Sequence, residues 1–333
     1  MARSHFTLAA LATAAVADLD VVKTAPFGSI SGGEFSSALL TGRDGKHWII
    51  RVPRQSRAES EQSADLVALR ALSAGVRARL PFAVTSFAGQ APVEGTRAIV
   101  YEFVYGEKVA LDQMDASLAA SVGRAVAAIH ALPTSFVSDA GLPVASSVEC
   151  LRATLSITDR AAATGLVPAM LLERWEKATD DHLLWQFQPT VINGALTADS
   201  LLSSNGSVCG VLGWHELRVG DPARDLFWLL GSQAENVPEA AFEAYTTARG
   251  GSDRQLLHRA MLYAELEIAR WLLHGTETRD TEVVDDAVAM LHGLVDRVQS
   301  DVMNPIGPPT MPVPTVSEVE ALLDSTERRA GTA

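Results

Sequence analysis

Cysteines and long apolar runs are scarce in this chain, and their scarcity excludes several kinds of protein. Only Cys150 and Cys209 occur among 333 residues. They are far apart and in no metal-ligand spacing, so the sequence predicts neither a disulfide framework nor a zinc site. No run of about 18 apolar residues is present to span a membrane. We therefore expect a protein of the reducing cytoplasm with no membrane partner.

Basic residues are also few compared with acidic ones. The chain has 27 Lys and Arg against 40 Asp and Glu, a formal net charge of −13, and the acids are spread along it. This balance argues against binding to nucleic acid or to an anionic membrane. A composition that is 47% hydrophobic and 20% charged is typical of a globular protein with a substantial core.

Several catalytic motifs are missing as well. The stretch GSISG at residues 28–32 has its serines at the wrong places for a nucleophile elbow. Residues 42–47 form too short a segment for a phosphate-binding P-loop. The histidines are scattered in no triad or metal spacing, and His130 lies in an apolar helical segment, where a hydrogen-bonded core histidine is the commoner outcome.

The first third of the chain is mainly strand-like. An Ala-rich stretch at residues 6–17 resembles a short signal peptide, but alanine outnumbers leucine and the run is short, which favours an ordinary first helix. Apolar runs on both sides of residues 42–45 predict a hairpin. A helix is expected at 59–78 and a buried strand at 98–104. These features predict a small antiparallel sheet with one helix packed on it.

Long helical segments follow residue 106, at 118–131, 170–184, 239–248 and 253–274, and a strand-like stretch at 191–220 interrupts them. The pattern predicts an α+β fold with an N-terminal lobe at 1–104 and a helical lobe at 105–300 that contains a hairpin region at 191–226. The tail at 301–333 is Pro-rich, and Ser317 with Glu320 forms a capping box for a last short helix.

Ordered segments of the chain resemble the macrolide branch of the aminoglycoside phosphotransferase family. They are WIIRVPR at 48–54, RLPFAV at 79–84, AAIHALP at 127–133 and the block at 191–226. The resemblance implies a bilobal protein-kinase-like fold. It also implies transfer of a nucleotide γ-phosphate, from ATP or GTP, to a drug hydroxyl, a reaction that depends on positioning and on metal ions that neutralise charge.

The resemblance places a nucleotide site in the N-terminal lobe. Gly28, Gly32 and Gly33 fall in the turn over the phosphates, where glycine permits close approach of the backbone. Arg51 falls at the position of the phosphate-binding cation, and Asp65 matches the acid that would hold it. An ordinary hairpin turn and a surface ion pair remain alternatives for these residues.

The resemblance also places the hinge that meets the nucleobase at residues 101–104. Glu102 and Val104 are its candidate contacts. A buried strand would show the same sequence pattern, so the pattern does not distinguish a hinge from a strand.

In the second lobe, the residues that carry out the chemistry in the family are replaced. The family's His-Gly-Asp-Leu is Asn193-Gly194-Ala195-Leu196 here, and alanine can neither accept nor hold a proton. Ser200 replaces the next metal ligand, and Gly213 replaces the aspartate that precedes tryptophan. Magnesium requires carboxylate oxygens, so the sequence argues against a metal site. No intact catalytic residue is predicted.

Two acids are candidate surrogates for the lost carboxylates, namely Asp199 beside Ser200 and Glu216 just after Gly213. The framework around the altered positions is kept: Gly194, Leu196, Trp214 and residues 220–225 match the family. Within residues 220–225, Asp221 is placed to cap a helix that begins at Pro222. Acids after residue 264 would suit a cationic antibiotic in the cleft, although a solvated helix surface gives the same pattern.

Three functions follow from these observations. The favoured one is a catalytically degenerate pseudokinase that binds a nucleotide, a small ligand or a protein partner. The alternative is an active ATP- or GTP-dependent phosphotransferase that acts on a macrolide- or aminoglycoside-like hydroxyl through a rebuilt metal site. A structural relative that binds no nucleotide is the third.

Overall fold

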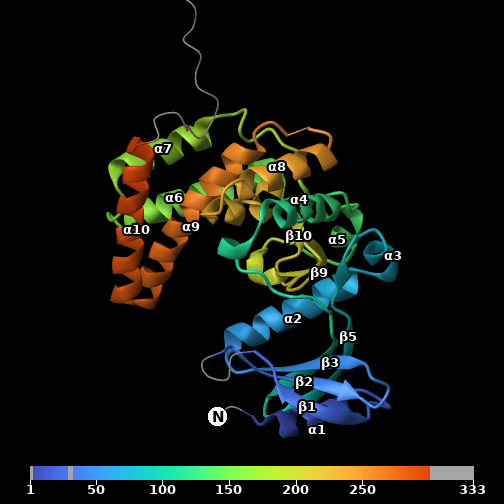
Figure 1. Ribbon diagram of the computed structural model, residues 1–333. Helices are drawn as coiled ribbons and strands as arrows, with labels where there is room; N and C mark the ends of the chain where they lie inside the picture. The colour runs from blue at the N-terminus through green and yellow to red at the C-terminus, as the bar shows by residue number, and fades with distance from the viewer. Residues whose placement is uncertain (1–2, 29–32, 252, 301–333) are drawn as a thin grey trace, which may run out of the picture.

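The computed structural model describes residues 3–28, 33–251 and 253–300, and its N-terminal region is built around a sheet (Figure 1). The predicted glycine Gly32 and the predicted tail at 301–333 lie outside these residues. The elements of the region are α1 (His5–Ala15), β1 (Val21–Pro26), β2 (Phe35–Gly42), β3 (His47–Pro53), α2 (Ser56–Ala71), α3 (Ala74–Arg77), β4 (Ala83–Val84), β5 (Phe87–Val93) and β6 (Thr96–Glu102).

Five of these strands form an antiparallel sheet in the order β1-β2-β3-β6-β5. Side chains along β2 alternate between buried and partly exposed, as the period of a strand with one covered face requires. Leu8 and Ala12 of α1 pack into the same buried cluster as Leu40 and Ile50 of the sheet. The predicted first helix and the predicted hairpin at 42–45 are both confirmed.

The single helix predicted at 59–78 is wrong, because the chain forms α2 and then the short α3. Leu72 leaves the helical conformation, and Ser73 is extended and precedes α3. The Arg77 side chain donates hydrogen bonds to the carbonyl oxygens of Leu72 and Leu69, at 2.6 and 2.9 Å. These bonds satisfy carbonyls at the end of α2 that have no partner within the helix, so the break is stable.

The C-terminal region is mostly helical. Its elements are η1 (Leu111–Gln113), α4 (Ala116–His130), α5 (Ser135–Asp139), α6 (Ser147–Ala163), α7 (Ala169–Asp180), β7 (Thr190–Ile192), η2 (Ala198–Ser200), β8 (Leu201–Ser204), β9 (Ser207–Val211), β10 (Arg218–Gly220), η3 (Pro222–Asp225), η4 (Phe227–Gly231), α8 (Val237–Ala248), α9 (Leu256–Thr278) and α10 (Thr281–Ser300).

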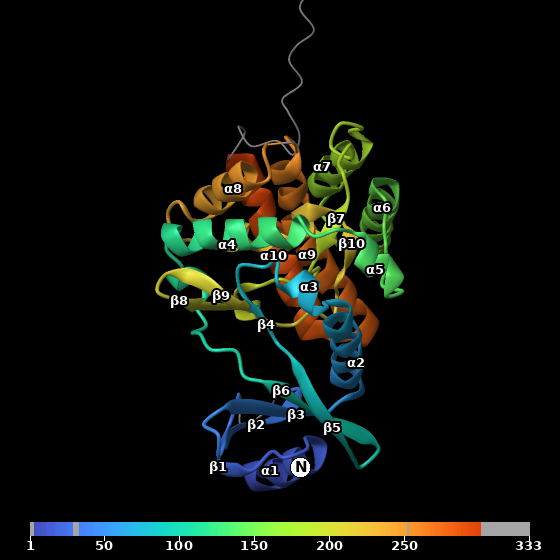
Figure 2. The same cartoon turned by 90° about the vertical axis from the view of Figure 1, so that its right-hand side faces the viewer.

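Helices α4 and α8 lie side by side above the short strands (Figure 2). Their close approach depends on Gly123, since a Cβ there would lie 2.1 Å from the carbonyl oxygen of Ala241. Helices α9 and α10 form an antiparallel pair on the other side (Figure 1). The sequence analysis did not single out α6 or α10, and the helix predicted at 170–184 ends earlier, at Asp180.

Two small sheets lie between the five-stranded sheet and the helices. β7 pairs with β10, and β8 and β9 form a hairpin to which β4 adds as a parallel strand. β4 precedes residue 104, yet it pairs with the C-terminal region. Helix α2 lies between the five-stranded sheet and that region (Figures 1 and 2). No helix in the described part of the chain is apolar and long enough to cross a membrane.

Candidate functional site

The loop that resembles the family's catalytic loop is anchored by a buried carboxylate, Asp225. Its two oxygens accept hydrogen bonds from the backbone N–H groups of Asn193 and Gly194, both at 2.7 Å. The Nε2 atom of His130 lies 3.1 Å from the same carboxylate, and its Nδ1 atom lies 2.9 Å from the Tyr245 hydroxyl. His130 is thus a hydrogen-bonded core histidine, as predicted, and it helps to hold the carboxylate that binds the loop.

Asn193 joins the two loops on which the family resemblance rests. Its side-chain amide donates to the carbonyl oxygen of Gly213, at 2.9 Å, and its side-chain oxygen accepts from the N–H of Ala195, at 3.1 Å. Gly194 has a φ of +83°, and a Cβ there would lie 2.6 Å from the carbonyl oxygen of Glu216. Only glycine fits this position, so the kept glycine has a geometric reason.

The two positions that lost their carboxylates line different cavities. Ala195 lines a cavity of about 620 Å³ in the C-terminal region. Gly213 lines a smaller cavity of about 180 Å³ together with Arg51 and Asp65. The smaller cavity brings two predicted nucleotide-site residues together with one degenerate position, and Ala195 is not among the residues that line it.

Arg51 and Asp65 do not form the expected ion pair. The Arg51 guanidinium lies over the Phe35 ring, 3.9 Å from its centroid. Asp65 instead accepts a hydrogen bond from the backbone N–H of Trp214, at 2.7 Å. Burial raises the pKa of the Asp65 carboxyl, an effect that the Trp214 bond and the charges of Arg51 and His215 only partly oppose. Asp65 therefore ties α2 to the loop at residue 213.

Neither candidate surrogate carboxylate is unengaged in this structure. Asp199 is exposed and its carboxylate lies 3.3 Å from the Lys108 ammonium. Glu216 lines the larger cavity and pairs with Arg218. Ser200 closes its own turn, where its hydroxyl lies 3.3 Å from the backbone N of Thr197. The described residues include no cluster of three or more His, Cys, Asp or Glu that could hold a metal ion.

Asp221 caps η3 as predicted, since its carboxylate accepts from the backbone N–H of Ala223 at 2.9 Å and η3 begins at Pro222. The other carboxylate oxygen accepts from Arg259 Nε at 2.8 Å and from the Tyr263 hydroxyl at 2.9 Å. Arg259 is completely buried. No local sequence pattern marked Arg259, because two of its partners, Asp221 and Leu184, are far from it along the chain, although Asp253 is close.

The remaining predicted nucleotide-site residues lie at, or a few residues beyond, the ends of strands of the five-stranded sheet. Gly28 is exposed, with a φ of +80°, and Gly33 is partly buried just before β2. Glu102 is exposed at the end of β6, and its N–H donates to the carbonyl oxygen of Ser86 at 2.9 Å. Val104 packs against Gly210, where a Cβ would lie 2.7 Å from the Val104 Cγ1 atom. None of these four residues lines the cavity at Gly213.

The acids of α9 are paired with arginines. Glu265 is buried and bonded to Arg174 at 2.9 Å and to the Trp175 indole at 2.9 Å. Glu267 lies 3.1 Å from Arg224 and 3.3 Å from Arg270 in the larger cavity. Glu265 and Glu267 are therefore not left open to a cationic antibiotic. Other acids after residue 264 are exposed, as the alternative of a solvated helix surface predicted; among them are Glu277, Asp280, Glu282, Asp285 and Asp286.

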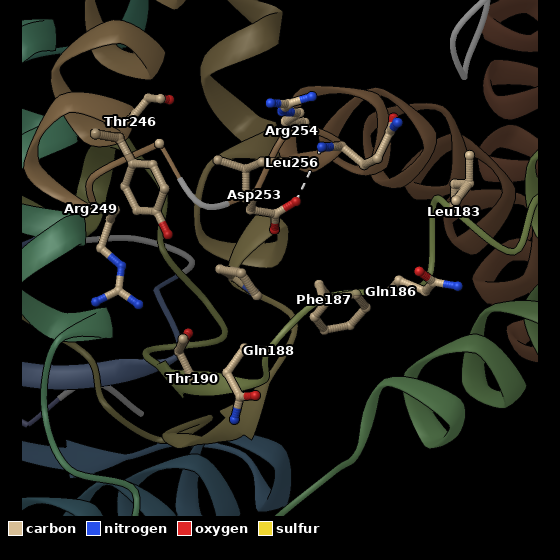
Figure 3. A pocket seen from close by; sticks show the side chains of 14 residues that line it. Leu183, Gln186, Phe187, Gln188, Thr190, Thr246, Arg249, Asp253, Arg254 and Leu256 are labelled. Atoms are coloured by element: carbon tan, nitrogen blue, oxygen red, sulfur yellow. Dashed lines mark hydrogen bonds between the residues drawn. The ribbon is translucent and has the colours of Figure 1, made fainter.

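A further cavity of about 710 Å³ lies elsewhere in the C-terminal region (Figure 3). Arg249 and Arg254 line it, and Phe187 and Gln188 contribute from the segment before β7. Neither Ala195 nor Gly213 contributes to it.

Comparison with known proteins identifies the family of this chain. A profile of the phosphotransferase enzyme family matches residues 29–263. An uncharacterized Bacillus subtilis (strain 168) protein, YcbJ, is 26% identical over 228 residues, which cover 66% of this chain and 74% of that protein.

Solved structures with the same fold include macrolide 2'-phosphotransferase MphH from Brachybacterium faecium, at 23% identity and a TM-score of 0.71, covering 86% of this chain and 98% of that one. The GDP complex of wild-type aminoglycoside 2'-phosphotransferase-IIIa has 16% identity and a TM-score of 0.70, covering 87% and 98%. Both the predicted kinase-like fold and the predicted relationship are confirmed, and the chain belongs to the phosphotransferase enzyme family.

Proposed function

We propose that this chain is a catalytically degenerate member of its family, which binds ligands in its cavities and does not transfer phosphate. One observation carries the proposal. The loops at Ala195 and Gly213 keep their hydrogen-bonded framework through Asp225, Asn193 and Asp65, but the two positions themselves present a methyl group and a hydrogen atom. The chemistry is lost where the scaffold is kept.

Phosphoryl transfer needs groups that these positions cannot supply. The hydroxyl that attacks must be oriented or deprotonated by a side chain with a lone pair, and Ala195 has none. The magnesium ions that neutralise the phosphates are bound by hard oxygen ligands. Gly213 has no side chain, and the Ser200 hydroxyl is engaged in its own turn. The residues present therefore do not fit a magnesium site.

The alternative is an active phosphotransferase with a rebuilt site, and Glu216 is the observation in its favour. Glu216 lines the same cavity as Ala195, so a carboxylate does face that space. Its pairing with Arg218 compensates its charge and occupies its carboxylate, which makes it a poor match for a metal ligand. Asp199 is directed toward Lys108 and solvent.

The cavity at Gly213, with a volume of about 180 Å³, is the proposed site for the phosphates of ATP or GTP, since it is too small to hold a whole nucleotide. Arg51 and His215 line it and are candidate partners for phosphate oxygens, while Glu34, Glu61 and Asp65 also line it. Those carboxylates repel a polyphosphate unless a cation lies between them. With no carboxylate at residue 213 to recruit that cation, nucleotide affinity should be modest and should change little with magnesium.

Isothermal titration calorimetry with ATP and with GTP, each with and without magnesium, tests the proposal. We expect affinities that differ less than threefold between the two conditions, and a loss of binding in Arg51→Gln. Arg54→Gln is the matched control, since Arg54 lies just after β3 and bonds to Ser36 at 3.0 Å, outside the cavity. A tenfold or larger gain with magnesium would favour the active alternative. Absence of any nucleotide binding would remove the nucleotide from the proposal.

A further inference from the structure

The cavity that Ala195 lines, which is larger than the one at Gly213 but not than the one in Figure 3, has the size and lining of a small-molecule site. Its volume of about 620 Å³ falls in the usual range for such sites, roughly 300–1,000 Å³. Helix α6 lines one side with Ala153 and Ile157, and Phe227 adds an aromatic surface. An organic molecule of modest size would find both apolar contact and a polar region here.

The polar region of this cavity is dominated by three arginines. Arg218 comes from β10, Arg224 from η3 and Arg270 from α9. Glu267 lies between two of them, with its carboxylate 3.1 Å from Arg224 and 3.3 Å from Arg270, and Glu216 pairs with Arg218. Three cations thus face two carboxylates.

The other charged residues of the cavity are engaged by groups outside the arginine cluster. Asp221 is bound by Arg259, Arg57 pairs with Glu61 on its own helix, at 3.0 Å, and Glu149 bonds to the backbone N of Ser146 at the start of α6. The three arginines and their two carboxylates therefore carry about one positive charge in excess within the cluster, while the charged side chains that line the whole cavity, Glu149 included, balance. The excess within the cluster is opposite in sign to the chain as a whole, whose formal net charge is −13.

The arginines are also partly removed from water and close to one another. Burial, and next the charge of Arg224, lower the pKa of both Arg218 and Arg270. An anion placed among the three guanidinium groups would relieve that repulsion. Arginine suits this task because its planar fork can donate two parallel hydrogen bonds to a carboxylate or a phosphate.

We propose that this cavity binds a small organic anion, a carboxylate or a phosphate ester, whose charged group lies among Arg218, Arg224 and Arg270 and whose body packs on Phe227 and α6. The proposal deepens the proposed function, because it names the ligand class of the cavity at Ala195. It also excludes polycationic aminoglycosides as preferred ligands, since their ammonium groups would meet the surplus arginine.

Calorimetry with four ligands of similar size tests the charge preference. Glucose 6-phosphate and glucuronate are the anionic probes, glucose is the neutral one and glucosamine is the cationic one. We expect at least one anion to bind at least tenfold more tightly than glucose, glucosamine to bind no more tightly than glucose, and the anion affinity to fall as salt is raised. The stronger of the two anions tells whether a phosphate or a carboxylate is preferred.

Variants assign the binding to the cavity. Arg270→Gln and Arg218→Gln should each weaken the anion at least tenfold. Arg254→Gln is the matched control, because Arg254 lines the other cavity (Figure 3) and should leave the affinity unchanged. The proposal is overturned if neither anion binds better than glucose, if glucosamine binds best, or if Arg254→Gln weakens the anion as much as Arg270→Gln does.

The outcomes are independent of those for the proposed function. Phosphate transfer to a drug would refute the proposal that the chain is catalytically degenerate. The anion preference would still be decided by these titrations alone. Loss of anion binding in Arg270→Gln, in a protein that transfers no phosphate, supports both.

Discussion

Replacing Gly213 with aspartate should create a magnesium dependence of nucleotide binding. The added side chain has room, because a Cβ at residue 213 meets no atom closer than His215 Nδ1, at 4.0 Å. The backbone there has a φ of +70°, which aspartate tolerates at a cost of about 1 kcal/mol. The smaller entropy of the unfolded chain offsets part of that cost, so the variant should fold normally.

The magnitude follows from the charges around the cavity. Without magnesium, a new carboxylate beside Asp65 adds repulsion against the phosphates. One such pair at roughly 8 Å contributes about 2 kcal/mol at an effective dielectric constant near 20. With magnesium, the same carboxylate and the phosphates can share the ion. We therefore expect the ratio of affinities with and without magnesium to rise at least tenfold in Gly213→Asp.

The matched comparison is Ala195→Asp, which places the same carboxylate in the cavity of about 620 Å³. Calorimetry with ATP, with and without magnesium, should give Ala195→Asp the same ratio of affinities as the unmodified chain and should give Gly213→Asp a higher ratio. Urea denaturation verifies that both variants fold. Asn193 is left unchanged, because its side chain bonds to both loops. A raised ratio in Ala195→Asp alone, or in neither folded variant, would refute the assignment of the two cavities.

Three further predictions concern the framework. Asp225→Ala leaves three buried donors without an acceptor and should lower the free energy of unfolding by about 3–5 kcal/mol, whereas exposed Asp199→Ala should change it by less than about 0.5 kcal/mol; urea denaturation measures both. Burial raises the folded-state pKa of Asp65, so its stabilising contribution is complete below the unfolded-state pKa and is lost as pH rises through the folded-state pKa. The stability of Asp65→Asn, compared with the natural chain at the same pH, should therefore be higher at pH 7 than at pH 3.5. The opposite trend in urea midpoints would contradict this. Gly123→Ala should cost about 1–3 kcal/mol by pushing α4 from α8, while Gly75→Ala in α3, where a Cβ meets nothing within 4 Å, should be neutral or stabilising by thermal denaturation.

Short-range patterns predicted much of the fold. The hairpin at residues 42–45, the strand near residue 100 and the cap at Asp221 each depend on neighbouring residues, and each is present. The break between α2 and α3 was missed because it depends on the Arg77 side chain reaching back to α2. A helical period alone does not reveal such a bond.

The candidate site was only partly predictable for the same reason. The ordered resemblance identified Ala195 and Gly213 as the altered chemical positions, but it could not tell that they line separate cavities. The arginine cluster combines Arg218 and Arg224, which lie on the consecutive elements β10 and η3, with Arg270 of α9, which is distant along the chain. The acids after residue 264 left open a site for a cationic antibiotic or a solvated helix surface, and they did not reveal that folding brings Arg224 and Arg270 onto Glu267.

Mass spectrometry of drug phosphorylation tests the central claim most directly. The purified chain is incubated with ATP or GTP, magnesium and either erythromycin or kanamycin, and the drug is examined for the mass of an added phosphate. Because Ala195 and Gly213 supply neither a base nor a metal ligand, we predict no phosphorylated drug beyond the amount formed without protein. Accumulation of phosphorylated drug above that control, lost on Glu216→Gln, would contradict the claim and identify a rebuilt active site.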